Sequence, residues 1–242
     1  IHQHHTLTGN LYTLPPEKRP VSFLRTMYQL TVGLSRLCRE WPGDIDLIHA
    51  GFFPNVLAAA KSRGHRKQPK VVHALHHPPE EILRSAYRRY WRLWKNAPLV
   101  ADGILTVSRH TQDHIQALYG KDSYIVGNGL ERDILNTPKD LSLRESLGWK
   151  PDQPVLVYVG SLTRRKGLEV LFEAFAGLKK RYPEALLAIV GGGYQPYFRS
   201  LATGFGLGED IHWAGPVSRK RLIQYLDAAT VFCFPSYSEG FG

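Results

Sequence analysis

The residues with the clearest chemical potential are glycines and cations that follow short apolar runs in the C-terminal third of the sequence. The run Val155–Val159 leads into GSLTRRKG at positions 160–167, and the run Leu186–Val190 leads into a glycine triplet at 191–193. Glycines let a ligand approach the backbone closely, and the unpaired amides at the start of a helix attract phosphate. The loop carries three consecutive cations, Arg164, Arg165 and Lys166. These features predict a pocket for a phosphorylated ligand, and a nucleotide is the interpretation we favour.

The elements that must position these loops follow the strand–helix–strand order of an open parallel sheet. A helical period begins at Leu168, and further strands are expected at 211–214 and 231–234. In such sheets ligands bind outside the carboxyl ends of the strands. Both glycine loops lie at such ends, so the fold class predicted here is α/β with a parallel sheet.

In the N-terminal half, histidines lie at or near the carboxyl ends of two expected strands. His49 lies in an expected strand at 46–50, and His76 and His77 directly follow a second one at 71–75. An imidazole there can hydrogen-bond a sugar hydroxyl, or a phosphate when it is charged. The alternative is that these histidines only pack or cap their turns. Further on, we expect a strand at 103–108, with Ser108 as the N-cap of a helix at 109–119, and a strand at 124–126.

Three segments at 160–167, 190–193 and 235–242, the last reading PSYSEGFG, together resemble the donor-binding half of a GT-B fold glycosyltransferase of the retaining family 4 (group 1) type. The HHP and NG sequences at 76–78 and 128–129 are similar to elements of that family's other half. The resemblance implies two Rossmann-like, doubly wound parallel-sheet domains. We expect an acceptor-side domain at 1–140 and a nucleotide-sugar-binding domain at 141–242, with 136–154 as the linker.

The resemblance also implies residue roles. Lys166 would hold the donor diphosphate, Glu239 would contact the donor sugar, and His76 would face them from the other domain; these are the predicted catalytic residues. Where the family has an arginine after the first glycine, this sequence has Ser161. Whether Arg164 or Arg165 replaces that arginine stays open. The full set of predicted donor-binding residues is Gly160, Ser161, Arg164, Arg165, Lys166, Gly191, Gly192, Glu239, Gly240, Phe241 and Gly242. The residues predicted for the acceptor or the cleft are His49, His77 and Asn128.

Complete enzymes of the resembled family are longer than 242 residues. Their first strand and glycine-rich loop are not found before Ile1, and their second glutamate would follow Gly242. We therefore expect a fragment in which both domains are incomplete, and one that is inactive by itself. The expected parent is a glycosyltransferase that moves a sugar from a nucleotide-diphosphate sugar to a glycan or lipid-linked acceptor with retention of configuration. The EGFG sequence argues against a sugar epimerase of the same fold.

The charge balance leaves alternatives open. The formal net charge is +10 and the pI is about 9.6, which suits acidic ligands, anionic membranes or nucleic acid. A basic nucleic-acid-binding protein is therefore one alternative, although no zinc spacing or RNP-like motif supports it. An inactive donor-binding fragment is the other. For the preferred function we expect no nucleic-acid partner, no cofactor beyond the nucleotide-sugar co-substrate, and no metal.

A helix expected at 80–97 is relevant to where the protein is located in the cell. It carries one stripe of Leu83 and four aromatic residues (Tyr87, Tyr90, Trp91, Trp94) and a second, basic stripe (Arg84, Arg88, Arg92, Lys95). Such a helix can bind an anionic membrane interface, or its aromatic stripe can simply face the core. No apolar run is long enough to span a bilayer, and two separated cysteines fit a reducing compartment. We expect a cytoplasmic protein and keep peripheral contact with the inner face of a membrane as a hypothesis.

Overall fold

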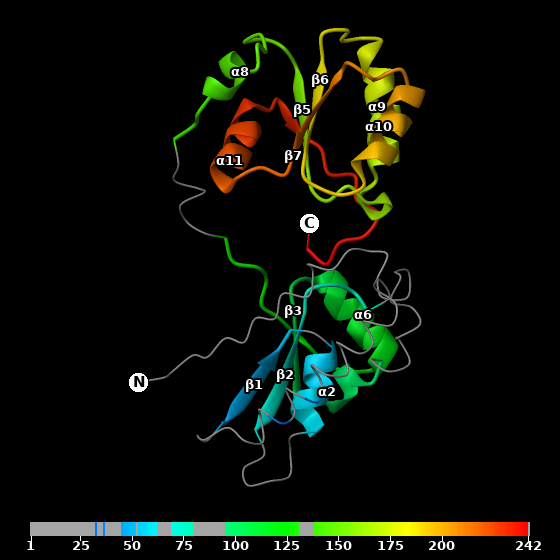
Figure 1. The fold of residues 1–242 in the computed structure, drawn as a ribbon. Coiled ribbons are helices and arrows are strands. Elements are labelled where there is room, and N and C mark those ends of the chain that lie inside the picture. The colour runs from blue at the N-terminus through cyan, green and yellow to red at the C-terminus, as the bar shows by residue number, and fades with distance from the viewer. Residues whose placement is uncertain are drawn as a thin grey trace. The chain divides into compact units, whose positions relative to one another are not determined.

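The computed structural model describes residues 45–51, 53–61, 69–79, 95–130 and 138–241, together with Val32 and Arg36. They form two compact units (Figure 1). One unit comprises Ile1–Asn128 with Gly240–Gly242, and the other comprises Gly129–Glu239. This contact boundary falls inside the predicted first domain, so the domain limit at 140 stays a prediction.

The first unit contains a four-stranded parallel sheet in the order β1-β2-β3-β4. Its strands are β1 (Leu47–Ala50), β2 (Lys70–Leu75), β3 (Gly103–Thr106) and β4 (Tyr124–Ile125). The helices are α2 (Phe53–Lys61), α5 (Ala97–Val100) and α6 (Arg109–Tyr119). Side chains of all three helices join the sheet in one apolar core, which includes Val56, Val71, Ala97, Ile104 and Ile115.

The predicted start of α6 is confirmed at its N-cap. Ser108 has an extended backbone, and its side chain accepts a hydrogen bond from the Thr111 backbone amide at 3.2 Å. This bond satisfies one of the amides that the first turn of a helix leaves without a partner. Gly120 ends the helix in the left-handed conformation, with φ of 58°, a conformation that glycine adopts without steric cost.

The second unit contains four parallel strands in the order β7-β6-β5-β8. They are β5 (Val155–Val159), β6 (Leu186–Val190), β7 (Ile211–Gly215) and β8 (Val231–Phe232). The chain runs outward from β5 to β7 and then returns to the other side of β5 for β8. The strand order therefore reverses between β5 and β8, and the carboxyl ends at such a reversal are where open α/β sheets bind ligands.

Helices cover both faces of this second sheet (Figure 1). The helices α9 (Leu168–Lys179) and α10 (Gln195–Gly204) lie on one face, and α8 (Ser142–Ser146) and α11 (Arg219–Ala228) lie on the other. Along β5, Leu156 and Tyr158 pack against the first pair, whereas Val155 and Val157 pack against the second. A strand buried on both faces needs apolar residues throughout, which explains the continuous apolar run in the sequence.

Helix α8 contradicts the prediction that 136–154 is only a linker. Leu143 is fully buried and Trp149 nearly so, and both belong to the core around α11. The Arg144 side chain also donates to the Ala228 carbonyl at 3.0 Å. A helix of five residues is too short to show a helical period of apolar residues in the sequence. It is stabilised instead by its packing against α11.

The α/β fold class with two parallel-sheet units is confirmed. The predicted membrane-contacting helix at 80–97 falls mostly on residues 80–94, which lie outside the described residues. Among the helices that the structure describes, none combines the length and the apolar composition that crossing a bilayer requires.

His73 gives the first unit a pH-dependent stability. Its buried ring donates from Nδ1 to the Ala50 carbonyl, at 3.1 Å, and Nε2 has no hydrogen-bond partner among the described residues. Burial is the main reason that the pKa of His73 falls from 6.5 to about 4; the bond to Ala50 opposes this shift, and His49 adds to it. The unfolded chain therefore binds an extra proton between these two values.

We expect the free energy of unfolding of the first unit to fall as the pH drops from about 6.5 to about 4. The expected loss is about 3 kcal/mol, at about 1.4 kcal/mol per pKa unit. Urea unfolding at a series of pH values measures it. His73→Asn, which keeps a donor near Ala50, should flatten this part of the profile, whereas the exposed His110→Asn should not. Equal profiles for wild type and His73→Asn would contradict the assignment.

Candidate functional site

Two loops meet at the strand-order reversal of the second unit. One follows β5, contains a single 3-10 turn at Arg164–Lys166, and leads through Gly167 into α9. The other follows β8 and contains Ser236 and Glu239. Since β5 and β8 are neighbouring parallel strands, their carboxyl ends bring these loops together. The amino end of α9 adds its positive partial charge at the same edge.

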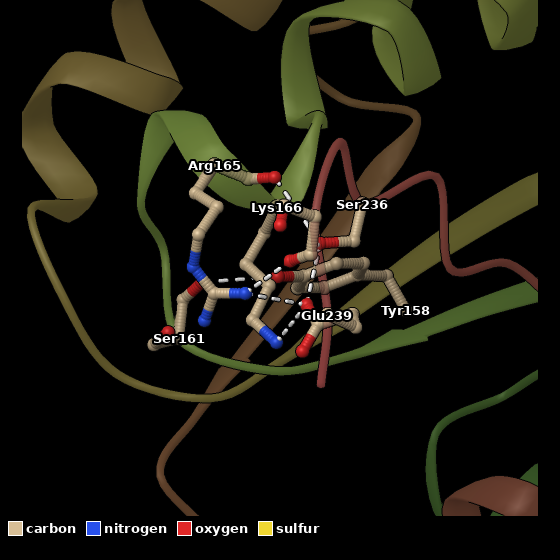
Figure 2. A network of polar contacts seen from close by, with 7 residues as sticks. Tyr158, Ser161, Arg165, Lys166, Ser236 and Glu239 are labelled. Atoms are coloured by element: carbon tan, nitrogen blue, oxygen red, sulfur yellow. Dashed lines mark hydrogen bonds and ion pairs between the residues drawn. The ribbon is translucent and has the colours of Figure 1, made fainter. Parts of the chain in front are cut away.

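An ion pair joins the two loops. The Lys166 ammonium lies 2.6 Å from Glu239 Oε1, and the two side chains are only 11% and 15% exposed. Figure 2 shows Arg165, Lys166 and Ser236 pointing toward this carboxylate. Partial burial reduces the screening of the pair by water, so it is held more firmly than a surface ion pair.

Arg165 and Ser236 complete the contacts of the carboxylate. Arg165 Nη1 lies 2.8 Å from Glu239 Oε1, and the Ser236 hydroxyl donates to the same oxygen at 2.5 Å. Burial by itself raises the pKa of Glu239, but the hydrogen bonds from Lys166, Ser236 and Arg165 outweigh it and leave that pKa below 4.5. Glu239 is therefore charged at neutral pH, and the two cations leave the cluster with one net positive charge.

Gly167 lets the two loops approach each other. Its φ of 69° is left-handed, and a Cβ at this position would lie only 2.0 Å from the Pro235 carbonyl oxygen. Any larger residue would therefore have to move the segment that carries Glu239. The glycine in the sequence motif thus has a packing reason as well as a conformational one.

We expect Gly167→Ala to lower the free energy of unfolding of the second unit by at least about 2 kcal/mol, from the left-handed backbone and the steric clash together. Gly177→Ala is the matched control, because Gly177 lies exposed within α9 with no atom within 4 Å of an added Cβ. The control should raise stability by about 0.5–1 kcal/mol. Urea denaturation measures both, and equal effects would contradict the packing argument.

The glycine turn after β6 lies directly against the loop after β5. A Cβ on Gly191 would lie 1.9 Å from the Gly160 carbonyl oxygen, and one on Gly192 would lie 3.1 Å from Pro216. The Gly160 amide donates to the Val190 carbonyl at 3.0 Å. The structure therefore brings together Gly160, Gly191 and Gly192, which the sequence analysis grouped as donor-binding residues.

Arg164 lies apart from this cluster. Its side chain is 78% exposed and lies 3.8 Å from Glu169, and its guanidinium group donates to the Tyr197 hydroxyl at 3.3 Å. It also lies over the Tyr197 ring. These partners belong to α9 and α10. Within the part of the chain that the structure describes, Arg165 contacts Glu239 and Arg164 does not.

Three residues of the site were not chosen from the sequence. Besides Ser236, these are Tyr158, whose hydroxyl donates to the Ser161 carbonyl at 2.9 Å, and Phe234, whose ring lies 4.6 Å from Lys166 Nζ. Burial and, secondarily, the charge of Glu239 raise the pKa of Tyr158 to about 12. Tyr158 and Phe234 fitted the apolar strand patterns, so nothing in the sequence separated them from the core.

The remaining predicted residues belong to the first unit. His49, His76, His77 and Asn128 are all exposed, His49 in β1 and the histidine pair just after β2. Gly240 also belongs to this unit, and its carbonyl accepts hydrogen bonds from Ser108 at 2.5 Å and Thr111 at 3.3 Å. A Cβ on Gly240 would lie 1.6 Å from the His76 carbonyl oxygen. Phe241 is exposed, and Gly242 lies outside the described residues.

Both halves of the chain match known family models. Residues 3–133 match the model described as Glycosyltransferase Family 4, and residues 140–242 match Glycosyl transferases group 1. The first match alone spans more than half of the 242 residues. The chain belongs to glycosyltransferase family 4, group 1.

Curated relatives of this group 1 glycosyltransferase chain are similar in sequence over part of their length. A putative teichuronic acid biosynthesis glycosyltransferase, TuaC, of Bacillus subtilis is 34% identical over 81% of the chain and 48% of its own length. A D-inositol 3-phosphate glycosyltransferase 2 of Catenulispora acidiphila is 31% identical over 59% of the chain and 36% of its own length. The chain thus spans half or less of these relatives.

Solved structures share the GT-B fold of this family member. Sucrose-phosphate synthase from Thermosynechococcus elongatus superposes with a TM-score of 0.74 at 21% identity, covering 97% of the chain and 59% of that protein. HepE of Anabaena, in complex with UDP and glucose, gives a TM-score of 0.70 at 21% identity, covering 86% of the chain and 56% of its own. At these identities the likeness establishes the fold alone.

No group of three or more His, Cys, Asp or Glu side chains that could hold a metal occurs in the part of this group 1 chain that the structure describes. The sequence has one Asp-x-Asp pattern at 44–46. Asp44 lies outside the described residues, and the exposed Asp46 precedes β1, at the amino end of the strand. Metal-independent chemistry stays a prediction.

Proposed function

We propose that this chain carries the donor-binding site of a glycosyltransferase that uses a nucleoside diphosphate sugar. The observation that carries the proposal is the Lys166–Glu239 ion pair at the strand-order reversal of a group 1 module. A cation, a helix amino end and a glycine loop at one sheet edge suit a diphosphate. The UDP and glucose named for HepE support a donor of this class.

In the proposed reaction, the bond between the anomeric carbon and the phosphate oxygen of the donor breaks, and its electron pair leaves with the nucleoside diphosphate. An acceptor hydroxyl oxygen forms the new bond to that carbon, and its proton passes to the leaving phosphate or to solvent. Charge develops on the departing phosphate, where a fixed cation stabilises it. We assign this role to Lys166, and it needs no metal. Retention of configuration is part of the proposal, on the strength of the family resemblance.

Glu239 is proposed to bind hydroxyl groups of the donor sugar. A carboxylate held by three donors through one oxygen can still accept bonds at its second oxygen. The loop around Gly160 and Gly191 would let the donor approach the backbone. His76, with His49, His77 and Asn128, is assigned to the acceptor side.

The acceptor is proposed to be a glycan or a lipid-linked sugar. The relative TuaC, a putative teichuronic acid biosynthesis glycosyltransferase, is compatible with a glycan acceptor. Cytoplasmic location, with peripheral contact at an anionic membrane face, completes the proposal. The basic composition is then assigned to an acidic donor and an anionic surface, and not to nucleic acid.

Calorimetric titration with nucleoside diphosphate sugars that differ in base and sugar tests this function. The expected result is saturable binding of one donor, with competition by the matching nucleoside diphosphate and none by single-stranded RNA or duplex DNA. The preferred base and sugar would also identify the donor. Tight, salt-sensitive binding of nucleic acid without donor binding would contradict the proposal and favour the alternative.

A further inference from the structure

We propose that Arg165 supplies the second cation for the donor diphosphate, in place of an arginine at the position of Ser161. This inference rests on the proposed function, because it names a further residue of the same site. Ser161 carries no charge, and its carbonyl is engaged by the Tyr158 hydroxyl at 2.9 Å. A second cation for the diphosphate would therefore come from another residue of the loop.

The Arg165 guanidinium lies where that charge is needed. Its Nη1 is 2.8 Å from Glu239 Oε1, the same oxygen that Lys166 contacts at 2.6 Å. Two cations that contact one oxygen atom are close enough to act on one diphosphate. The Arg165 side chain is 35% exposed, compared with 11% for Lys166, so a ligand arriving from solvent can reach it.

The backbone of Arg165 is fixed to the loop that carries Glu239. Its carbonyl accepts a hydrogen bond from the Tyr237 amide at 2.9 Å, and its Nη1 donates to the Ser238 carbonyl. Both ends of the residue are therefore tied to the 235–239 segment. A side chain held in this way loses less conformational freedom when it binds a ligand than an exposed arginine does.

Arg164 is the competing candidate, and its contacts exclude it from this role. Its side chain extends toward Glu169 and Tyr197, on the α9–α10 side, and is 78% exposed. The single 3-10 turn at Arg164–Lys166 points consecutive side chains in different directions. Of the two arginines that the sequence left open, only Arg165 meets Lys166 at a shared carboxylate.

Arginine suits this role chemically. Its planar group presents paired N–H donors that match phosphate oxygens, whereas lysine acts as a point charge. A pair of one arginine and one lysine thus gives both geometry and charge at the diphosphate. Glu239 orients the pair before the donor arrives.

The test is calorimetry with UDP, GDP, ADP and CDP on the whole chain, continued with whichever binds most tightly. Arg165→Ala should weaken binding about tenfold or more, as expected for a charged hydrogen bond. Arg165→Gln, which can keep the bonds to Ser238 and Glu239 without the charge, should weaken it nearly as much. Arg164→Ala should change it less than about twofold. Ser161→Arg in the Arg165→Ala background should restore most of the affinity, which a purely structural role would not predict.

The outcomes distinguish a failure of this inference from a failure of the function on which it rests. Loss of binding in Lys166→Ala but full binding in both Arg165 variants overturns the role of Arg165 and leaves the proposed function intact. Weakening by Arg164→Ala without weakening by Arg165→Ala assigns the second cation to the other arginine. Failure of the wild-type chain to bind any of the four nucleotides overturns both.

Discussion

Lys166→Ala is expected to weaken nucleoside diphosphate binding by about a hundredfold, near the upper limit for a hydrogen bond to a charged group. Lys166 is the least exposed cation of the site, and its ammonium lies closest to the Glu239 carboxylate. Removing it deletes the charge that the departing phosphate would meet. Arg165 and Ser236 still hold Glu239, so the fold of the loop should persist.

Calorimetry on the wild-type and variant chains measures this effect, with Lys180→Ala as the matched control. Lys180 is an exposed lysine at the other end of α9, so its removal should change affinity by less than about twofold. Thermal melting of each variant establishes that it is folded. If Lys166→Ala bound nucleotides as well as the control variant does, the diphosphate site would have to lie elsewhere.

Glu239→Gln is expected to move two affinities in opposite directions. Lys166 and Arg165 both contact this carboxylate. Without its negative charge, their positive charges are no longer partly neutralised, and they attract the phosphates more strongly. A unit charge at about 4 Å contributes about 1 kcal/mol even in water, so nucleoside diphosphates alone should bind about fivefold more tightly. The sugar, in contrast, loses a charged acceptor for its hydroxyl groups. The contribution of the sugar to the affinity of the whole donor should therefore fall about tenfold or more.

The measurement compares each nucleoside diphosphate with its sugar conjugate on wild type and Glu239→Gln. Glu184→Gln, an exposed residue of the same unit, controls for the general change in charge. A parallel change for both ligands would show that Glu239 makes no contact with the sugar. Weaker binding of the diphosphate alone would show that the carboxylate serves mainly to hold the two cations in place.

Much of the fold could be predicted because local patterns and packing agree. The run Val155–Val159 is buried on both faces of its sheet, and a continuous apolar run is typical of such a strand. The start of α6 followed from Ser108, whose side chain caps the first turn. Helix α8 could not be predicted, because Leu143 and Trp149 are fixed by contacts with α11 that lie far away in the sequence.

The candidate site was predictable in its motifs but not in its geometry. The resemblance singled out Lys166 and Glu239, and the structure joins them through neighbouring strands. The choice between Arg164 and Arg165 depends on how one 3-10 turn directs its side chains, which spacing alone does not determine. Ser236 lies inside the PSYSEGFG motif at 235–242, yet its bond to Glu239 depends on the fold of the 235–239 segment.

The most direct test of the account is a crystal structure of the chain with a bound nucleoside diphosphate. The account predicts that the diphosphate lies at the carboxyl ends of β5 and β8, with a phosphate oxygen about 3 Å from Lys166 Nζ, the distance of a charge-assisted hydrogen bond. A diphosphate bound on the first unit, or at the second unit away from Lys166 and Glu239, would contradict the central claim.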